Sequence, residues 1–190
     1  MTRIRTFIAV ETSPAVRRRA VDLQDKLRAS EVKASWTHPE NMHLTLQFLG
    51  DVDETLVPEV CRRVESAAAP FAPFQIEFSQ VGAFPALERP RTVWIGVDQG
   101  SQQLVDLQFA VQESLVEMRF PRERRTYKPH LTMGRVREGG ARQTRLAELI
   151  AHYRDFKAGS CDVNEVLIFA SYLERTGPTY QIMGRAPLDG

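Results

Sequence analysis

Two stretches of the chain, MHLTLQF at residues 42–48 and PHLTMGR at residues 129–135, are variants of one short phrase. In each, a histidine and a threonine stand two positions apart, and an apolar residue follows each of them. Side chains of a β-strand alternate between its faces, so residues two positions apart point the same way. Each phrase therefore predicts a strand with an apolar back in the core and a histidine–threonine pair on its front.

The two pairs are His43 with Thr45 and His130 with Thr132. They are the candidate functional residues, because two of only four histidines in the chain occupy the same local setting. The other two histidines lie in a turn beside a proline and near the end of a polar helix, where we expect solvated side chains.

The composition is that of an ordinary globular protein. Of 190 residues, 43% are hydrophobic and 26% charged, which allows a sizeable core and excludes a disordered chain. The formal net charge of +1 excludes a field strong enough to bind along a long nucleic acid, although a small or terminal phosphorylated ligand fits. Cys61 and Cys161 lie far apart and indicate reduced thiols. With no membrane-length apolar run and no signal-peptide pattern, we expect a monomeric cytoplasmic protein that does not enter a membrane.

Strands and helices alternate along the chain. Apolar alternation predicts a first strand at residues 4–10, and Ser13 with the proline after it starts an amphipathic helix of about residues 14–29. The first phrase, a second helix and a strand around residues 74–78 follow. The stretch at residues 81–90, which contains a glycine and two prolines, is expected to be the loop that joins two lobes.

The second half of the chain repeats this plan and carries the second phrase on its own second strand. The phrases lie about half the chain length apart, which indicates an internal duplication with approximate two-fold symmetry. We predict an α+β fold of two pseudo-symmetric lobes of β-sheet, with flanking helices, around a central cleft. The chain is then a single domain, residues 1–190, with lobes at about residues 1–84 and 91–187.

Two histidines that face one cleft are suited to phosphodiester hydrolysis. A neutral imidazole can take the proton of the attacking oxygen while a protonated one gives a proton to the leaving oxygen, both near neutral pH. The threonine hydroxyls can donate hydrogen bonds to non-bridging phosphate oxygens. This chemistry needs no metal or other cofactor. A zinc site on the two histidines would need a third ligand, and the spacing of the sequence indicates none.

The phrases and their surroundings resemble the two-histidine phosphoesterase superfamily, and within it the RNA 2′,3′-cyclic phosphodiesterases, once called 2′-5′ RNA ligases. The resemblance covers essentially the whole chain. It is carried by RTFIAV at residues 5–10, PENMHLTLQFLG at 39–50, GAFP at 82–85, RPR at 89–91 and PHLTMGRV at 129–136.

The resemblance implies hydrolysis of a terminal 2′,3′-cyclic phosphate of RNA to a 2′-phosphomonoester. It implies that His43 donates the proton to the departing 3′ oxygen, that His130 activates water, and that Thr45 and Thr132 hold the phosphate. By microscopic reversibility, 2′-5′ ligation is a side activity. Two alternatives stay open: a phosphodiesterase for small cyclic nucleotides or 2′-5′ oligonucleotides, and a module that binds nucleotides or RNA ends without turnover.

Phe48 and Arg135 also match positions associated with function in this family. Strict alternation, however, places Phe48 on the apolar face of its strand, so it can stack on a base only beyond the strand end. Alternation places Arg135 on the apolar face with Met133, unless Gly134 permits a bulge that redirects it. We predict a phosphate-binding Arg135 and a base-stacking Phe48.

Two further segments have open interpretations. The basic segment at residues 122–128 is typical of a solvated loop, but its cations can also guide RNA phosphates while Tyr127 stacks on a base. Trp36 fits either the core or the wall of the cleft.

Overall fold

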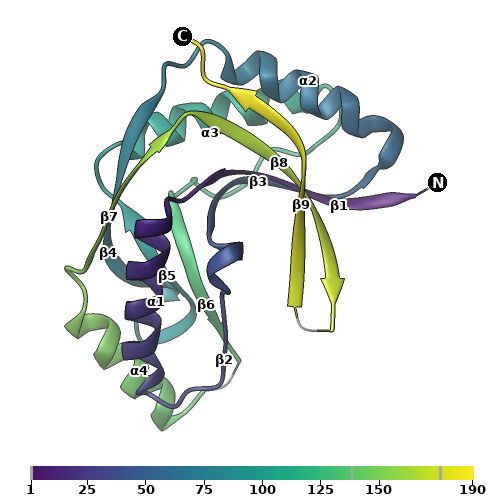
Figure 1. The fold of residues 1–190 in the computed structure, drawn as a ribbon. Coiled ribbons are helices and arrows are strands. Elements are labelled where there is room, and N and C mark those ends of the chain that lie inside the picture. Colours follow the sequence, from purple (N-terminus) through teal and green to yellow (C-terminus); the bar gives the residue numbers. More distant parts are fainter. Residues whose placement is uncertain (1, 138, 176) are drawn as a thin grey trace.

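Two antiparallel sheets form the frame of the molecule in a computed structural model that describes residues 2–137, 139–175 and 177–190 (Figure 1). The four-stranded sheet has the order β3-β1-β8-β9, and the five-stranded sheet has the order β2-β6-β5-β4-β7. The strands are β1 (Arg3–Glu11), β2 (Ala34–Trp36), β3 (His43–Asp53), β4 (Phe74–Ala86), β5 (Arg89–Val97), β6 (His130–Val136), β7 (Lys157–Val163), β8 (Glu165–Glu174) and β9 (Gly177–Pro187).

Helices cover one face of each sheet (Figure 1). Helix α2 packs on β8 and β9 and α3 on β3, while α4 packs on β4 and β5 and α1 on β7. Within the described residues, no helix is long and apolar enough to cross a membrane. The helices are α1 (Pro14–Arg28), α2 (Val57–Ala68), α3 (Ser101–Val116) and α4 (Ala141–His152), and the short 3₁₀ helices are η1 (Pro39–Asn41) and η2 (Glu54–Leu56).

Helix α1 shows how the sequence specifies these elements. The Ser13 hydroxyl accepts a hydrogen bond from the Val16 amide at 3.3 Å, and the first helical residue is a proline, whose missing N–H leaves no unsatisfied donor. The apolar residues at helical spacing are all buried, and a large shared core continues from them under both sheets. The predicted helix and the α+β class are confirmed.

The predicted loop at residues 81–90 is instead part of a long hairpin. Strand β4 runs to Ala86 and β5 begins at Arg89, so the glycine and prolines lie in paired strands. Gly82 has a specific reason to be glycine, because a Cβ atom there would lie 2.4 Å from the Trp94 ring that covers it. Sequence composition alone could not reveal this pairing partner.

Each sheet combines strands from both halves of the chain. The C-terminal hairpin β8–β9 pairs with β1, and β2 pairs with β6, which follows it by about a hundred residues. The boundary expected between lobes 1–84 and 91–187 falls at the β4–β5 hairpin and does not separate the two sheets. The two sheets are therefore the units that position the functional strands.

Candidate active site

His43 is the first residue of β3 and is half-buried among aromatic rings. The Phe7 ring stacks on its imidazole with 4.8 Å between centroids, and the Tyr180 ring meets it edge-on at 5.3 Å. Phe7 and Tyr180 come from β1 and β9, so the four-stranded sheet assembles this surround. A hydrogen bond with the backbone of Asn41, two residues earlier, holds the imidazole.

His130 is the first residue of β6 and is held in the same way. Its Nδ1 lies 2.7 Å from the carbonyl oxygen of Lys128, which is also two residues earlier. Because a carbonyl can only accept, Nδ1 carries the proton, and Nε2 of the neutral ring keeps its lone pair. The Phe84 ring meets this imidazole edge-on at 5.0 Å between centroids. The two histidines thus share a tethering geometry as well as a sequence phrase.

Both imidazoles favour the neutral form. Burial lowers the pKa of His43 to about 4; the hydrogen bond with Asn41 acts in the opposite direction, and the positive charge of Arg17 lowers the pKa further. Burial also lowers the pKa of His130, against the hydrogen bond with Lys128 and together with the charge of Arg135. At neutral pH each ring can therefore accept a proton.

The two histidine strands are in contact although they belong to different sheets. The Tyr127 hydroxyl, just before β6, donates a 3.0 Å hydrogen bond to the carbonyl oxygen of Thr45 on β3. Burial lowers the pKa of His130 and raises that of Tyr180, which touches His43; the charge of Arg135, on β6, adds to the first effect and opposes the second. The surroundings of the two imidazoles therefore overlap electrostatically.

Matched bulges bring Phe48 and Arg135 to the histidine faces of their strands. In the β1–β3 ladder, Ile8 pairs with Gln47 and Ala9 with Thr45, so Leu46 is an extra residue. The alternation is reset, and Phe48 is 64% exposed and packs 5.9 Å from Phe7 between ring centroids. The placement of Phe48 on the apolar face was therefore wrong.

Strand β6 has its bulge at the equivalent position. Gly134 pairs with Val93 but Thr132 pairs with Trp94, so Met133 is the extra residue. Arg135 is exposed as a result, as the glycine before it suggested. Thr132, like Thr45 on the other strand, is half-buried.

Sequence reasoning missed the aromatic residues around the histidines. Phe7, Phe169 and Tyr180 form one cluster with His43, yet they come from three strands that the sequence does not pair. The only available signal was that Phe7 alternates with the apolar face of its predicted strand. Phe84 lay in the stretch expected to be a loop.

In the basic segment before β6, residues 122–126 and Lys128 are exposed, as expected of a solvated loop. Arg122 forms a two-pronged ion pair with Glu113 at 2.6 and 2.7 Å. Tyr127 is enclosed, burial raises the pKa of its hydroxyl, and the hydroxyl is bonded to Thr45. Tyr127 therefore links two strands and is not placed to stack on a base. Among the described residues, no three histidine, cysteine or acidic side chains group as metal ligands.

Comparisons with known proteins identify the family. The model of the LigT-like phosphoesterases matches residues 10–94 and again residues 95–180. An RNA 2′,3′-cyclic phosphodiesterase of Methanothermobacter thermautotrophicus is 35% identical over 181 residues, which cover 95% of this chain and 97% of that protein. The crystal structure of the TT0787 protein of Thermus thermophilus superposes with a TM-score of 0.83 at 25% identity, covering 98% of this chain and 99% of that one.

A second solved structure shares the fold. The E. coli LigT protein in complex with 3′-AMP superposes with a TM-score of 0.80 at 22% identity, covering 99% of each chain. Together with the double match of the family model, these likenesses extend over nearly the whole chain. The resemblance carried by the two histidine phrases is confirmed, and the chain belongs to the LigT-like phosphoesterase family.

Proposed function

We propose that this protein hydrolyses the terminal 2′,3′-cyclic phosphate of RNA to a 2′-phosphomonoester, without a metal ion, and that His43 and His130 are its acid–base pair. The observation that supports the pair most strongly is their matched setting. Each imidazole begins a strand, bonds to the backbone two residues earlier, and lies on one of two contacting strands. The proposed substrate rests on relatives such as the Methanothermobacter enzyme.

In the proposed reaction, Nε2 of His130 takes a proton from water as the water oxygen attacks phosphorus. The hydrogen bond from Nδ1 to Lys128 fixes the tautomer that this step requires. The bond between phosphorus and the 3′ oxygen breaks, and His43 gives that oxygen a proton. The 2′ oxygen keeps the phosphate.

His43 must be protonated for this role, although its pKa of about 4 makes it neutral in the free protein at pH 7. An anionic phosphate beside the ring favours the imidazolium, so we assign uptake of this proton to substrate binding. The hydroxyls of Thr45 and Thr132 would donate to the non-bridging oxygens, and Arg135 would neutralise their charge. Phe48, exposed beside Phe7, would stack on the base.

The test is product analysis on an oligonucleotide with a 2′,3′-cyclic end, in a chelator and without added metal. We expect a 2′-phosphate product, and a fall in turnover of about 10²–10⁴-fold in His43→Ala and in His130→Ala. His152→Ala, which changes an exposed histidine at the end of α4, is the matched control. Near-normal turnover in either active-site variant would refute the assigned pair, and activity that returns only with zinc would favour a metal mechanism.

The same assay separates the remaining alternatives. Equal turnover of a cyclic mononucleotide would favour small cyclic nucleotides as the substrates, and binding without turnover would favour a binding module. In ligation, a 5′-hydroxyl would take the place of water: His130 would take its proton, His43 would again protonate the departing 3′ oxygen, and a 2′-5′ linkage would form. The two histidines would exchange roles when that linkage is broken. That linkage should appear only at high concentrations of both ends and should be absent in His130→Ala.

A further inference from the structure

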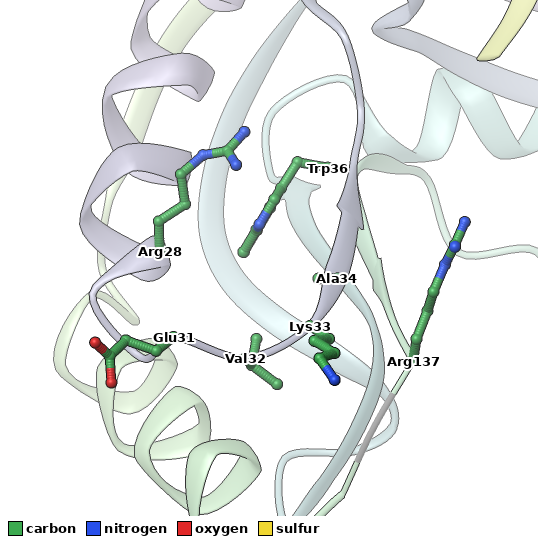
Figure 2. Close-up of a pocket in the computed structure, with 7 residues that line it drawn as sticks. All are labelled: Arg28, Glu31, Val32, Lys33, Ala34, Trp36 and Arg137. Atoms are coloured by element: carbon green, nitrogen blue, oxygen red, sulfur yellow. The ribbon is translucent and has the colours of Figure 1, made fainter. Parts of the chain in front are cut away.

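We propose that the hollow between the end of α1 and strand β2 binds single-stranded RNA that precedes the reacting terminus, an inference that rests on the proposed function. The hollow has a volume of about 510 Å³, and Figure 2 shows the side chains around it. Arg28, Lys33 and Arg137 supply three cations, and Glu31 is the one carboxylate among the described residues of the lining. The occupant best matched to this wall is a polyanion.

An aromatic ring accompanies these cations. Trp36 projects from β2 toward α1 (Figure 2), and the Arg28 guanidinium lies 5.2 Å from the centre of its ring. Arg28 also contacts Asp25 at 3.6 Å, in an ion pair whose side chains are 50% and 70% exposed. A pair this exposed is readily exchanged for a phosphate. An aromatic ring next to cations is the usual combination in sites for single-stranded nucleic acid, where a base stacks while its phosphate is neutralised.

The hollow is connected to the candidate active site through one pair of strands. Strand β2 is the edge of the five-stranded sheet and pairs directly with β6, with Trp36 opposite Gly134. Gly134 lies four residues beyond His130, which is about 13 Å along a strand. About four stacked nucleotides, at about 3.4 Å each, span that distance.

Exposed arginines mark the route between the two places. Arg135 and Arg137 flank the buried Val136, so both point to the face opposite to the core. The Arg137 amide donates a 2.8 Å hydrogen bond to the carbonyl oxygen of Lys33, which continues the ladder to the rim of the hollow. RNA leaving His130 would pass Arg135, then Arg137, and turn round the free edge of β2. The net charge of only +1 makes this cluster a local feature.

The test compares long and short substrates in Arg28→Ala/Arg137→Ala. For an oligonucleotide of about six nucleotides with a 2′,3′-cyclic end, we expect KM to rise roughly tenfold or more, because each lost phosphate contact is charge-assisted. For a 2′,3′-cyclic mononucleotide, KM and kcat should stay unchanged, since it cannot reach the hollow. The slope of log binding constant against log salt should become shallower by about 1.4, or about 0.7 for each lost contact.

Arg18→Ala/Arg145→Ala removes the same charge from exposed positions of α1 and α4 and is the matched control. We expect it to leave both substrates unaffected. Equal effects of the two double variants would mean that only the total charge matters, and would overturn the inference. An unchanged KM for the oligonucleotide in Arg28→Ala/Arg137→Ala would also overturn it. If the wild-type protein turns over neither substrate, the proposed function fails. Anisotropy of a labelled oligonucleotide without a cyclic end then decides separately whether the arginines bind RNA.

Trp36 gives an independent readout. The chain has two tryptophans, so Trp36→Phe leaves only Trp94 to fluoresce. We expect the oligonucleotide to quench wild-type emission more than a mononucleotide does, and the extra quenching to vanish in Trp36→Phe. Extra quenching that persists in that variant would overturn the stacking contact.

Discussion

His43 is the residue at which burial has its clearest consequence. Its imidazole is enclosed by Phe7 and Tyr180, and this enclosure lowers its pKa to about 4. The aromatic rings that hold the imidazole in place also oppose its protonation. His43, which we propose donates a proton, is therefore neutral in the free protein. It must first take up a proton when the anionic phosphate binds.

This pKa makes stability depend on pH. In the unfolded chain, His43 titrates near 6.5, so between pH 6.5 and 4 the unfolded state binds more protons than the native state. The free energy of unfolding should therefore fall as pH falls through this window, by up to about 3 kcal/mol from His43 alone. Above about pH 6.5, His43 is neutral in both the native and the unfolded state, and it no longer lowers the free energy of unfolding.

Urea unfolding of the wild type and of His43→Gln, measured between about pH 4 and pH 8, checks this expectation. Glutamine does not titrate, so its curve should lose less stability toward acid, while carboxylates contribute equally to both curves. Because the pKa of His130 is also lowered, the variant should keep part of the acid sensitivity. Parallel curves would contradict a depressed pKa at His43.

At the scale of single elements, the histidine strands show what local sequence can and cannot specify. The His–Thr pairs were predictable, because alternation over two residues involves no other part of the chain. The bulges at Leu46 and Met133 were not, because a bulge is defined by the register with a partner strand. The contact between Tyr180 and His43 could not be predicted either, since it depends on β9 joining a sheet formed mainly by earlier strands.

The hydroxyl of Tyr127 links two elements by a hydrogen bond whose contribution to stability and turnover can be measured. It donates to the Thr45 carbonyl and so ties the segment before β6 to β3. Tyr127→Phe keeps the ring but removes this bond and leaves a carbonyl unpaired, so we expect a loss of about 1–3 kcal/mol in the free energy of unfolding. We also expect kcat to fall more than KM rises, because the two histidine strands lose a shared anchor.

Denaturant unfolding and steady-state kinetics on a cyclic-ended oligonucleotide measure both effects. Tyr153→Phe, which changes a tyrosine just after α4, is the matched control and should change neither value appreciably. A Tyr127→Phe protein with lower stability but wild-type kcat would show that the bond serves the fold alone.

At the scale of the whole molecule, the sequence repeats and the two sheets do not coincide. The family model matches the chain twice, at residues 10–94 and 95–180, as an internal duplication predicts. The strands nevertheless interleave, since β1 pairs with β8 and β2 pairs with β6. The repeat was predictable from the two phrases, but the exchange of strands between halves was not, because pairing over such distances leaves no local pattern.

Interleaving predicts that neither half folds alone. Fragments 1–87 and 88–190, cut at the β4–β5 turn, should each lack a cooperative thermal transition, because each exposes the strand edges and core that the other half covers. Circular dichroism of the separate fragments measures this, and their equimolar mixture is the control that should regain structure. A cooperative transition in one isolated fragment would instead support independent lobes.

The matched bulges also give the molecule a polarity. The fifth position after each histidine is Phe48 on one strand and Arg135 on the other. If Phe48 stacks on the base and Arg135 binds the phosphate, as we propose, these two positions give a bound nucleotide one direction. The two strands share the position of the bulge, but one presents an aromatic ring and the other a cation. Exchanging these two side chains would then be the smallest change expected to reverse the orientation of the bound nucleotide.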